Sequence, residues 1–183
     1  MEYTWHYESP LGGITLTCED TALTGLWFDD GKYTASTPGT VREQKLVPVL
    51  EETVCWLDMY FSGREPDFTP PLCMNFTPFR RRVQEILLSI PWGQTMTYAQ
   101  IAERIASERH IEKMSARAVG GAVGHNNILL IIPCHRVTGS DGSLTGYAGG
   151  ISRKRKLLEL EGVKTAGERK RQSSLREQTG RIK

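Results

Sequence analysis

Apolar and polar positions near the start of the chain follow a pattern that predicts strands. Residues 13–18, with the sequence GITLTC, and residues 23–28, LTGLWF, are rich in β-branched and aromatic side chains. The stretches SPLGG and EDTA are expected to form turns, and TASTPGT a loop. Over residues 45–63 the apolar positions change to helical spacing and the segment ends in Ser-Gly, which predicts a helix.

The second part of the chain is predicted to be mostly helical, because its apolar residues recur at helical intervals. The predicted helices cover residues 77–93, 97–108, 115–126 and 153–162. Thr77, Thr97 and Ser115 stand at the expected starts, Pro78 follows the first of them, and Gly162 closes the last helix. Between them, the apolar residues 128–133 are expected to form a buried strand or extended core segment, and the glycine-rich residues 138–150 a loop.

A proline-rich segment divides the chain. REPDFTPPLCMNFTP contains four prolines and no periodicity, so we interpret it as a linker. The predicted division is an N-terminal domain of residues 1–75, a second domain of residues 76–163 and a tail of residues 164–183. The tail is polar and basic without a clear apolar face, which is typical of flexible chain ends.

Charge is distributed unevenly along the chain. Residues 1–75 carry 4 basic and 12 acidic side chains (−8), residues 76–163 carry 12 and 7 (+5), and the tail carries 7 and 2 (+5). This asymmetry favours a polyanionic partner on one side of the molecule, with ordinary surface charge as the alternative.

No apolar run reaches the roughly 18 residues of a membrane span, and no secretory signal is visible. We therefore expect a cytoplasmic location, with the nucleoid as the site in a prokaryote.

Two of the predicted helices, residues 97–108 and 115–126, are short and joined by the polar connection ERHIEKM. This arrangement fits a helix-turn-helix, in which the second helix enters a groove of DNA. That helix carries several glycines, although glycine costs about 1 kcal/mol in a helix interior. Their missing side chains would permit close approach of another backbone or of nucleic acid. The nearby basic residues that could contact phosphates are Arg80, Arg81, Arg82, Lys113 and Arg117.

The candidate chemistry centres on Cys134, which follows Pro133 at the end of the apolar run and precedes His135. A thiol reacts as its thiolate and needs a base or a positive charge nearby. Neighbouring side chains of an extended segment point to opposite sides, so we expect His135 to reach Cys134 through a water. A buried structural thiol is the alternative. Zinc and disulfides are disfavoured, because the four cysteines are far apart and form no C-x-x-C pair.

Three motifs, IPCHRV, the preceding ARAVGGAVGHN and the following GYAGG, strongly resemble the methylated-DNA–protein-cysteine methyltransferases, or O6-alkylguanine-DNA alkyltransferases. The resemblance covers roughly Thr77 to Gly162 and, more weakly, SPLGGITL near the N-terminus. It implies an α+β fold, with a small N-terminal α/β domain (ribonuclease H-like) followed by a mainly helical, winged-helix-like domain that binds DNA and holds the active site.

The resemblance also implies a reaction and its main residues. The reaction is direct DNA repair by irreversible, single-turnover transfer of an alkyl group from O6-alkylguanine, and from O4-alkylthymine, to the protein's own cysteine after base flipping. Carried over by position, Cys134 is the acceptor, His135 is the base acting through a water, and Glu161 orients it. Asn126 would tie the recognition helix to the active-site segment. Tyr98 would help to rotate the nucleotide and donate a proton toward the guanine oxygen.

The other implied residues bind DNA or line the substrate pocket. Arg117 would enter the base stack where the flipped base has left. The implied DNA-binding residues are Arg117, Tyr98, Ser115, Ala116, Ala118, Gly120 and Gly121, and the implied pocket residues are Val123, Pro133, Val137, Tyr147, Ala148, Gly149 and Lys154. The small side chains of Val123, Gly124 and Ala148 lead to the hypothesis that adducts larger than methyl are tolerated.

The sequence departs from the family pattern in three respects. Ala148 stands where some members have a serine, and the connection before the recognition helix is longer than in some relatives. Some members bind zinc in the N-terminal domain, but here Cys18 alone fits the pattern and Leu23 occupies a ligand position, so we expect no metal. The resemblance implies no cofactor. We expect a monomer that binds no membrane, and the expected partner is double-stranded DNA containing O6-alkylguanine.

Two other functions stay open at this point. A lesion sensor without transfer activity would share the scaffold, but such proteins replace the acceptor cysteine, which is present here as Cys134. A Cys-His hydrolase acting on peptides or amides would need an oxyanion hole and a direct Cys–His contact, and neither is evident from the sequence.

Overall fold

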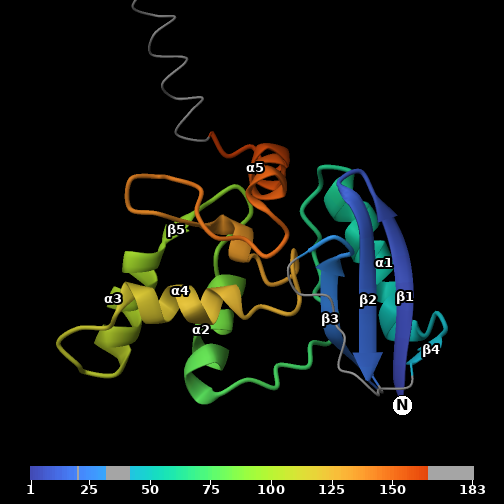
Figure 1. Cartoon of the computed structure of the whole chain (residues 1–183), viewed down its shortest axis with the longest axis horizontal. Coiled ribbons are helices and arrows are strands. Elements are labelled where there is room, and N and C mark those ends of the chain that lie inside the picture. The colour runs from blue at the N-terminus through green and yellow to red at the C-terminus, as the bar shows by residue number, and fades with distance from the viewer. Residues whose placement is uncertain (20, 32–41, 165–183) are drawn as a thin grey trace, which may run out of the picture.

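A computed structural model of the chain describes residues 1–19, 21–31 and 42–164. Within these ranges the strands are β1 (Glu2–Ser9), β2 (Gly12–Glu19), β3 (Ala22–Phe28), β4 (Arg42–Gln44), β5 (Met96–Thr97) and β6 (Val137–Thr138). The helices are α1 (Pro48–Phe61), α2 (Pro78–Leu88), α3 (Tyr98–Glu108), α4 (Ala116–Gly124) and α5 (Ile151–Leu160), with one short 3-10 helix, η1 (Cys134–Arg136). The arrangement, shown in Figure 1, confirms the predicted α+β class.

The N-terminal part is a four-stranded sheet in the order β3-β2-β1-β4, with α1 packed against it (Figure 1). Neighbours β1, β2 and β3 are antiparallel, and β4 runs parallel to β1. The two predicted strands lie within β2 and β3, and the predicted helix contains α1, so these predictions are confirmed. The three-residue β4 is largely polar and was not predicted, and the TASTPGT loop falls outside the described residues.

The second part is mainly helical, as predicted. The Thr77 side chain accepts a hydrogen bond from the Arg80 amide at the start of α2. At the start of α3, Thr97 and Gln100 form a capping box, in which each side chain accepts from the other residue's backbone. At the start of α4 the Ser115 side chain accepts a hydrogen bond from the Ala118 amide. Local sequence therefore sets the starts of these three helices, and α3 and α4 pack against each other as a helix-turn-helix requires.

Residues 128–133 depart from the predicted strand or extended segment. Only Ile128 bridges to a strand, at Leu26. The chain then turns: the Ile132 amide donates to the Ile128 carbonyl at 3.1 Å, and Leu130 has a φ of 67°. The prediction of burial is confirmed, but the predicted conformation is wrong, because a short apolar run satisfies either a strand or a buried turn.

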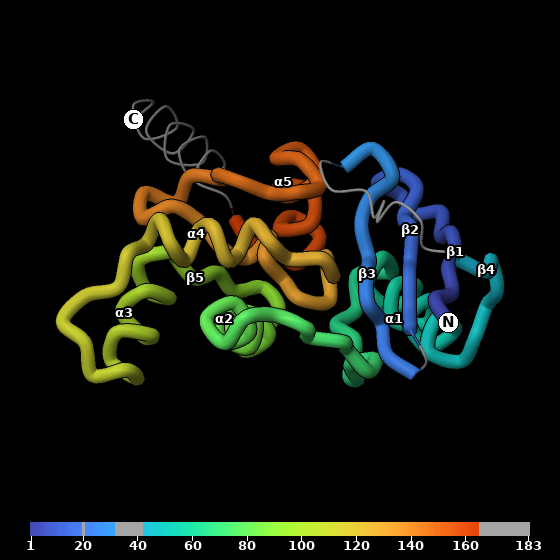
Figure 2. The backbone as a smooth tube through the Cα atoms, turned by 60° about the horizontal axis from the view of Figure 1, so that its bottom comes forward, coloured from blue at the N-terminus to red at the C-terminus, as the bar shows by residue number. Residues whose placement is uncertain are grey.

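Strand β3 joins the two parts of the molecule. The Leu26 amide donates to the Asn127 carbonyl, and the Leu129 amide donates to the Leu26 carbonyl, both at 2.9 Å. In Figure 2 the chain that follows α4 accordingly reaches the side of β3. Side chains from both parts form one continuous apolar core. No helix among the described residues is long and apolar enough to cross a membrane, and of the predicted tail only Lys164 is described.

Candidate active site

Cys134 opens η1 and is 4% exposed. Its Sγ atom lies 3.1 Å from Nδ2 of Asn126, which donates to it. The same nitrogen donates to the Ile132 carbonyl at 2.8 Å, and the Asn126 Oδ1 accepts from the Ile128 amide at 2.9 Å. Asn126 lies just after His125, the C-cap residue of α4, so one buried amide links the end of this helix to the turn that carries the thiol.

Burial raises the pKa of the Cys134 thiol to about 11, although the Asn126 hydrogen bond and the charge of Lys154 act in the opposite direction. The thiol is therefore protonated near neutral pH. A thiol reacts through its thiolate, so Cys134 needs a proton acceptor in order to react.

His135 is fully buried, and its Nε2 lies 2.6 Å from Oε1 of Glu161. Burial lowers the pKa of His135, against the pull of Glu161, so the ring is neutral near pH 7. A neutral ring beside a carboxylate carries its proton on Nε2, which donates to Glu161. The other nitrogen, Nδ1, is buried and has no hydrogen-bond partner among the described residues. That atom is therefore left with a lone pair, which is the property of a base.

Glu161 follows α5 and is held by several donors. Arg136 donates to Oε2 through Nε at 2.8 Å and to Oε1 through Nη2 at 3.1 Å. Burial alone would raise the pKa of Glu161, but the hydrogen bonds from His135 and Arg136 outweigh it and lower the pKa to about 2. Glu161 is thus a permanent carboxylate that orients the His135 ring.

Lys154 is a buried cation on α5. Its Nζ donates to the carbonyl of Thr145 at 2.8 Å and to that of Gly146 at 3.4 Å. Burial lowers the pKa of Lys154 to about 8, against the attraction of Cys134. This side chain therefore anchors the loop of residues 138–150 through two of its carbonyl groups and places positive charge near the thiol.

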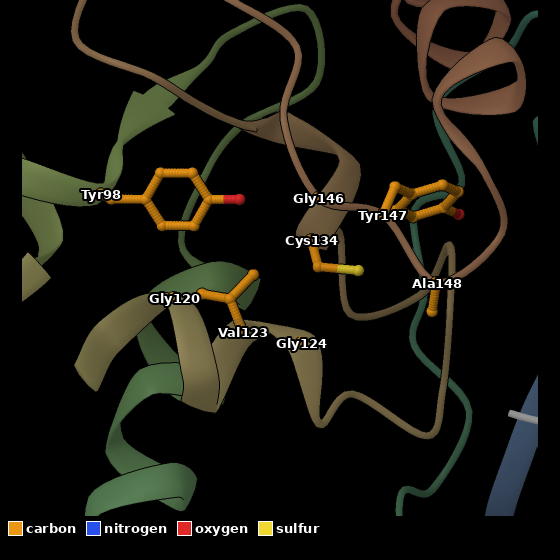
Figure 3. Close-up of a pocket in the computed structure, with 8 residues that line it drawn as sticks. All are labelled: Tyr98, Gly120, Val123, Gly124, Cys134, Gly146, Tyr147 and Ala148. Carbon is orange, nitrogen blue, oxygen red and sulfur yellow. The ribbon is translucent and has the colours of Figure 1, made fainter. Parts of the chain in front are cut away.

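The thiol faces a cavity of about 210 Å³ (Figure 3). The residues that line it are Tyr98, Gly120, Val123, Gly124, Cys134, Gly146, Tyr147 and Ala148. The side chain of Tyr98 points into the cavity from the side opposite Cys134, and its hydroxyl donates to the Thr145 carbonyl at 3.2 Å. Cavities of about 150 Å³ hold a benzene ring, so this one admits a flat aromatic group beside the thiol.

The structure brings together only some of the implied pocket residues. Val123, Tyr147 and Ala148 line the cavity. Pro133 and Val137 are buried, Gly149 lies between Tyr147 and Phe28, and Lys154 donates to a carbonyl of the loop, but none of these four is among the residues that line the cavity. The cavity is also lined by Gly124, one of the small residues expected near the pocket, and by Gly146.

The implied DNA-binding residues lie on α4 and its cap, except Tyr98, which begins α3. Ser115, Ala116, Arg117, Ala118 and Gly121 are exposed, and Gly120 is half-buried next to the Tyr98 ring. Within the described ranges, no ion pair involves Arg117. A Cβ atom added to Gly121 or Gly124 would meet nothing within 4 Å. Packing inside the protein therefore does not require glycine at either position.

Sequence reasoning missed two groups that contact the catalytic candidates. Tyr60 of α1 donates from its hydroxyl to Oε1 of Glu161 at 2.7 Å. Arg136 stands next to His135 in the PCHR motif, yet only the fold shows that it pairs with Glu161. For Tyr60 the sequence holds no signal beyond its place in the apolar pattern of a helix. No group of three or more His, Cys, Asp or Glu side chains in the described part of the chain could hold a metal ion.

Comparison with known proteins gives two adjoining family matches. Residues 78–163 match the model of the 6-O-methylguanine DNA methyltransferase DNA-binding domain, and residues 3–74 match the ribonuclease-like domain of the same family. The methylated-DNA–protein-cysteine methyltransferase of Mycobacterium tuberculosis is 42% identical over 159 residues, which are 85% of this chain and 92% of that protein. The protein of the same name from Saccharolobus islandicus is 41% identical over 158 residues, covering 86% and 94%.

A solved structure agrees with these matches. The crystal structure of Mycobacterium tuberculosis OGT in complex with DNA superposes with a TM-score of 0.74 at 39% identity, covering 87% of this chain and 92% of that one. The similarity therefore extends through both parts of the fold.

Proposed function

The chain belongs to the 6-O-methylguanine DNA methyltransferase family, and from this premise we propose that Cys134 is its alkyl acceptor. The chain is an enzyme of direct DNA repair, and its partner is DNA. The observation that carries the assignment of Cys134 is its position: a buried thiol at the wall of a cavity that fits one flat aromatic group, beside a neutral histidine. The match of the DNA-binding domain model to residues 78–163 supports the same assignment.

The proposed reaction is a single displacement. The thiol proton passes through a water to Nδ1 of His135, whose other nitrogen donates to Glu161. The Sγ atom of Cys134 then forms a bond to the alkyl carbon while the bond between that carbon and O6 of guanine breaks. The guanine takes up one proton at its oxygen as it leaves, and this proton moves to N1 in the ordinary form of the base. The proton that His135 took from the thiol passes through solvent to replace the one that the donor gave up. The thioether product has no easily hydrolysed bond, so each chain reacts once.

Tyr98 is the proposed proton donor toward the guanine oxygen. Burial raises the pKa of Tyr98, with a weaker opposing effect of its hydrogen bond to Thr145, so the phenol keeps its proton at neutral pH. Anionic guanine is a poor leaving group, and a donor at its oxygen lowers the barrier. The hydroxyl faces the cavity opposite Cys134, which is where a leaving group would lie (Figure 3).

The direct test is a mass measurement on the full chain. A duplex containing O6-methylguanine is incubated with the protein, and the peptide that contains Cys134 is weighed. We expect a gain of one methyl group that saturates at one per chain. Lesion binding without any gain on this peptide would favour a sensor, and repeated turnover on a peptide substrate would favour a hydrolase.

Replacing Gly121 by alanine is expected to stabilise the protein and weaken its binding to DNA. Nothing within the protein opposes the new Cβ atom, so the helix gains about 0.5–1 kcal/mol in the free energy of unfolding. The exposed methyl group then stands between α4 and DNA, and we expect the dissociation constant for duplex DNA to rise about tenfold. Thermal unfolding and fluorescence anisotropy measure the two effects.

The matched control for Gly121→Ala is Cys55→Ala, which changes an exposed position of α1. This variant should leave the affinity for DNA unchanged. Equal affinity in Gly121→Ala and the unsubstituted protein would show that this face of α4 does not lie against DNA.

Replacing Arg117 by alanine is expected to slow repair in duplex DNA and to spare the chemistry. If the guanidinium fills the gap left by the flipped base, its loss costs about 1–3 kcal/mol, or about 5- to 150-fold in rate. The rate with free O6-methylguanine base, which needs no flipping, should change less than about twofold. Arg64→Ala, which removes the same charge from the N-terminal part, is the control. Equal losses on both substrates would place Arg117 in the chemical step instead.

Several broader expectations belong to this proposal. We infer a cytoplasmic location, with the nucleoid as the site in a prokaryote, because the DNA substrate lies there. We also keep the division into domains of residues 1–75 and 76–163 with a tail of residues 164–183. The range of alkyl groups is proposed to extend beyond methyl, since Gly124 and Ala148 leave one side of the cavity without long side chains.

A further inference from the structure

Tyr60 is a fully buried phenol of the N-terminal part that the proposed reaction does not use. It stands one residue before the end of α1. Its hydroxyl lies 2.7 Å from Oε1 of Glu161, to which it donates, and 3.2 Å from Nε2 of His135. A side chain of one domain thus contacts both members of the buried pair in the other.

Aromatic packing determines where this hydroxyl lies. The Tyr60 ring stacks on Trp56 of the same helix, with centroids 5.2 Å apart and an angle of 12°. Its edge contacts with Trp92 and with the His135 ring have centroid distances of 5.1 Å and 6.3 Å. Rings held on several sides do not rotate freely, so the hydroxyl is aimed at Glu161 by packing and is not merely drawn there by its hydrogen bond.

We propose that Tyr60 is a positioning residue for alkyl transfer, whose hydroxyl holds Glu161 and His135 so that Nε2 of His135 carries the proton and Nδ1 remains the base. This inference rests on the proposed roles of Cys134 and His135. It makes the N-terminal domain part of the active site, because α1 supplies the group.

The effect of the hydroxyl follows from charge. Oε1 of Glu161 accepts hydrogen bonds from Tyr60, His135 and Arg136. Each donor draws negative charge away from the others. Without the phenol, the carboxylate attracts the His135 proton more strongly and favours the doubly protonated ring, which has no lone pair on Nδ1.

The other groups around His135 fit this role for Tyr60. Burial raises the pKa of Tyr60 well above its ordinary value, with Glu161 adding to the effect, so the phenol remains a donor throughout the working range. The titratable and charged groups that face the His135 ring are Tyr60 of α1, Cys134 and Arg136 of η1, Tyr147 of the loop, and Lys154 and Glu161 of α5 and its end. Of these, Tyr60 and Arg136 donate to Glu161, and Arg136 keeps its bonds when the phenol is removed.

The test is the pH profile of alkyl transfer for Tyr60→Phe in the full chain, measured on an O6-methylguanine duplex. We expect the acid limb of the profile to move to higher pH, with a rate about tenfold lower near pH 6 and less than about threefold lower near pH 8. The control is Tyr7→Phe, which removes a phenol that donates to Asp58 of the same helix and not to Glu161. Its profile should match that of the unsubstituted protein.

A second measurement needs no activity. With 15N-labelled histidine, the four imidazoles are followed through a pH titration by NMR, and His135 is assigned from the signal lost in His135→Gln. We expect His135 to protonate at a higher pH in Tyr60→Phe than in the unsubstituted protein. An equal loss of rate at every pH, with an unchanged His135 titration, would overturn the proposal and leave Tyr60 a structural residue.

The outcomes separate this inference from the proposed function. If the unsubstituted protein fails to transfer methyl groups, the proposed function fails, and the NMR titration still decides the role of Tyr60. If thermal unfolding measurements show that Tyr60→Phe is not folded, 3-fluorotyrosine is placed at position 60 instead. This stronger donor should move the acid limb to lower pH, and an unmoved limb would overturn the proposal.

Discussion

Replacing Cys134 by serine is expected to reduce methyl transfer by at least about a thousandfold, because a hydroxyl is far less acidic than a thiol and His135 cannot convert it to the anion that displaces guanine. The substitution shortens one bond and keeps a polar atom near Nδ2 of Asn126, so the fold should persist. Affinity for a duplex with O6-methylguanine should change less than about threefold. Transfer is measured by peptide mass and binding by anisotropy.

The matched control for Cys134→Ser is Cys55→Ser, which alters an exposed cysteine of α1. It should transfer one methyl group per chain at the unsubstituted rate. Methyl transfer that persists in Cys134→Ser would show that another residue is the acceptor, and a joint loss of transfer and of lesion binding would show that the thiol is needed for the fold of the cavity.

The parts of the fold that the sequence predicted best are those with local causes. Thr77, Thr97 and Ser115 cap the helices that they were expected to start, because a cap depends on residues within one turn. Strand β4 was not predicted, since its pairing partner β1 lies some 40 residues earlier. An apolar run has the same appearance in a strand and in a buried turn, so residues 128–133 were predicted in the wrong conformation.

The same distinction applies to the site. Cys134 and His135 are adjacent, and the motif around them carries their candidate roles. Tyr60 is separated from His135 by 75 residues and from Glu161 by 101, and nothing in a helical apolar pattern distinguishes a core tyrosine from one that contacts a catalytic pair. Lys154 was implied to line the pocket, but its contacts with carbonyl groups of a glycine-rich loop depend on how that loop folds.

Glu161→Gln is expected to destabilise the protein by about 3–5 kcal/mol, because it leaves the Arg136 guanidinium buried without its counter-charge. The amide also presents a donor where the carboxylate accepts from its neighbours. For a chain of this size the loss corresponds to a melting temperature lower by roughly 10 °C. Transfer measured below the new melting temperature should fall about a hundredfold, since His135 loses the acceptor that orients it. Glu159→Gln, an exposed position of α5, is the control.

The pH dependence of stability shows whether the charge of Glu161, and not its shape, is responsible. Its pKa is lowered from 4.5 to about 2 in the folded chain. A carboxyl group with a lowered pKa stabilises the fold fully above its unfolded value, and this contribution is lost as the pH falls toward the folded value. The difference in unfolding free energy between the unsubstituted protein and Glu161→Gln should therefore be largest above pH 4.5 and shrink as the pH approaches about 2. A difference that stays constant across this range in urea titrations would mean that lost packing, and not lost charge, destabilises the variant.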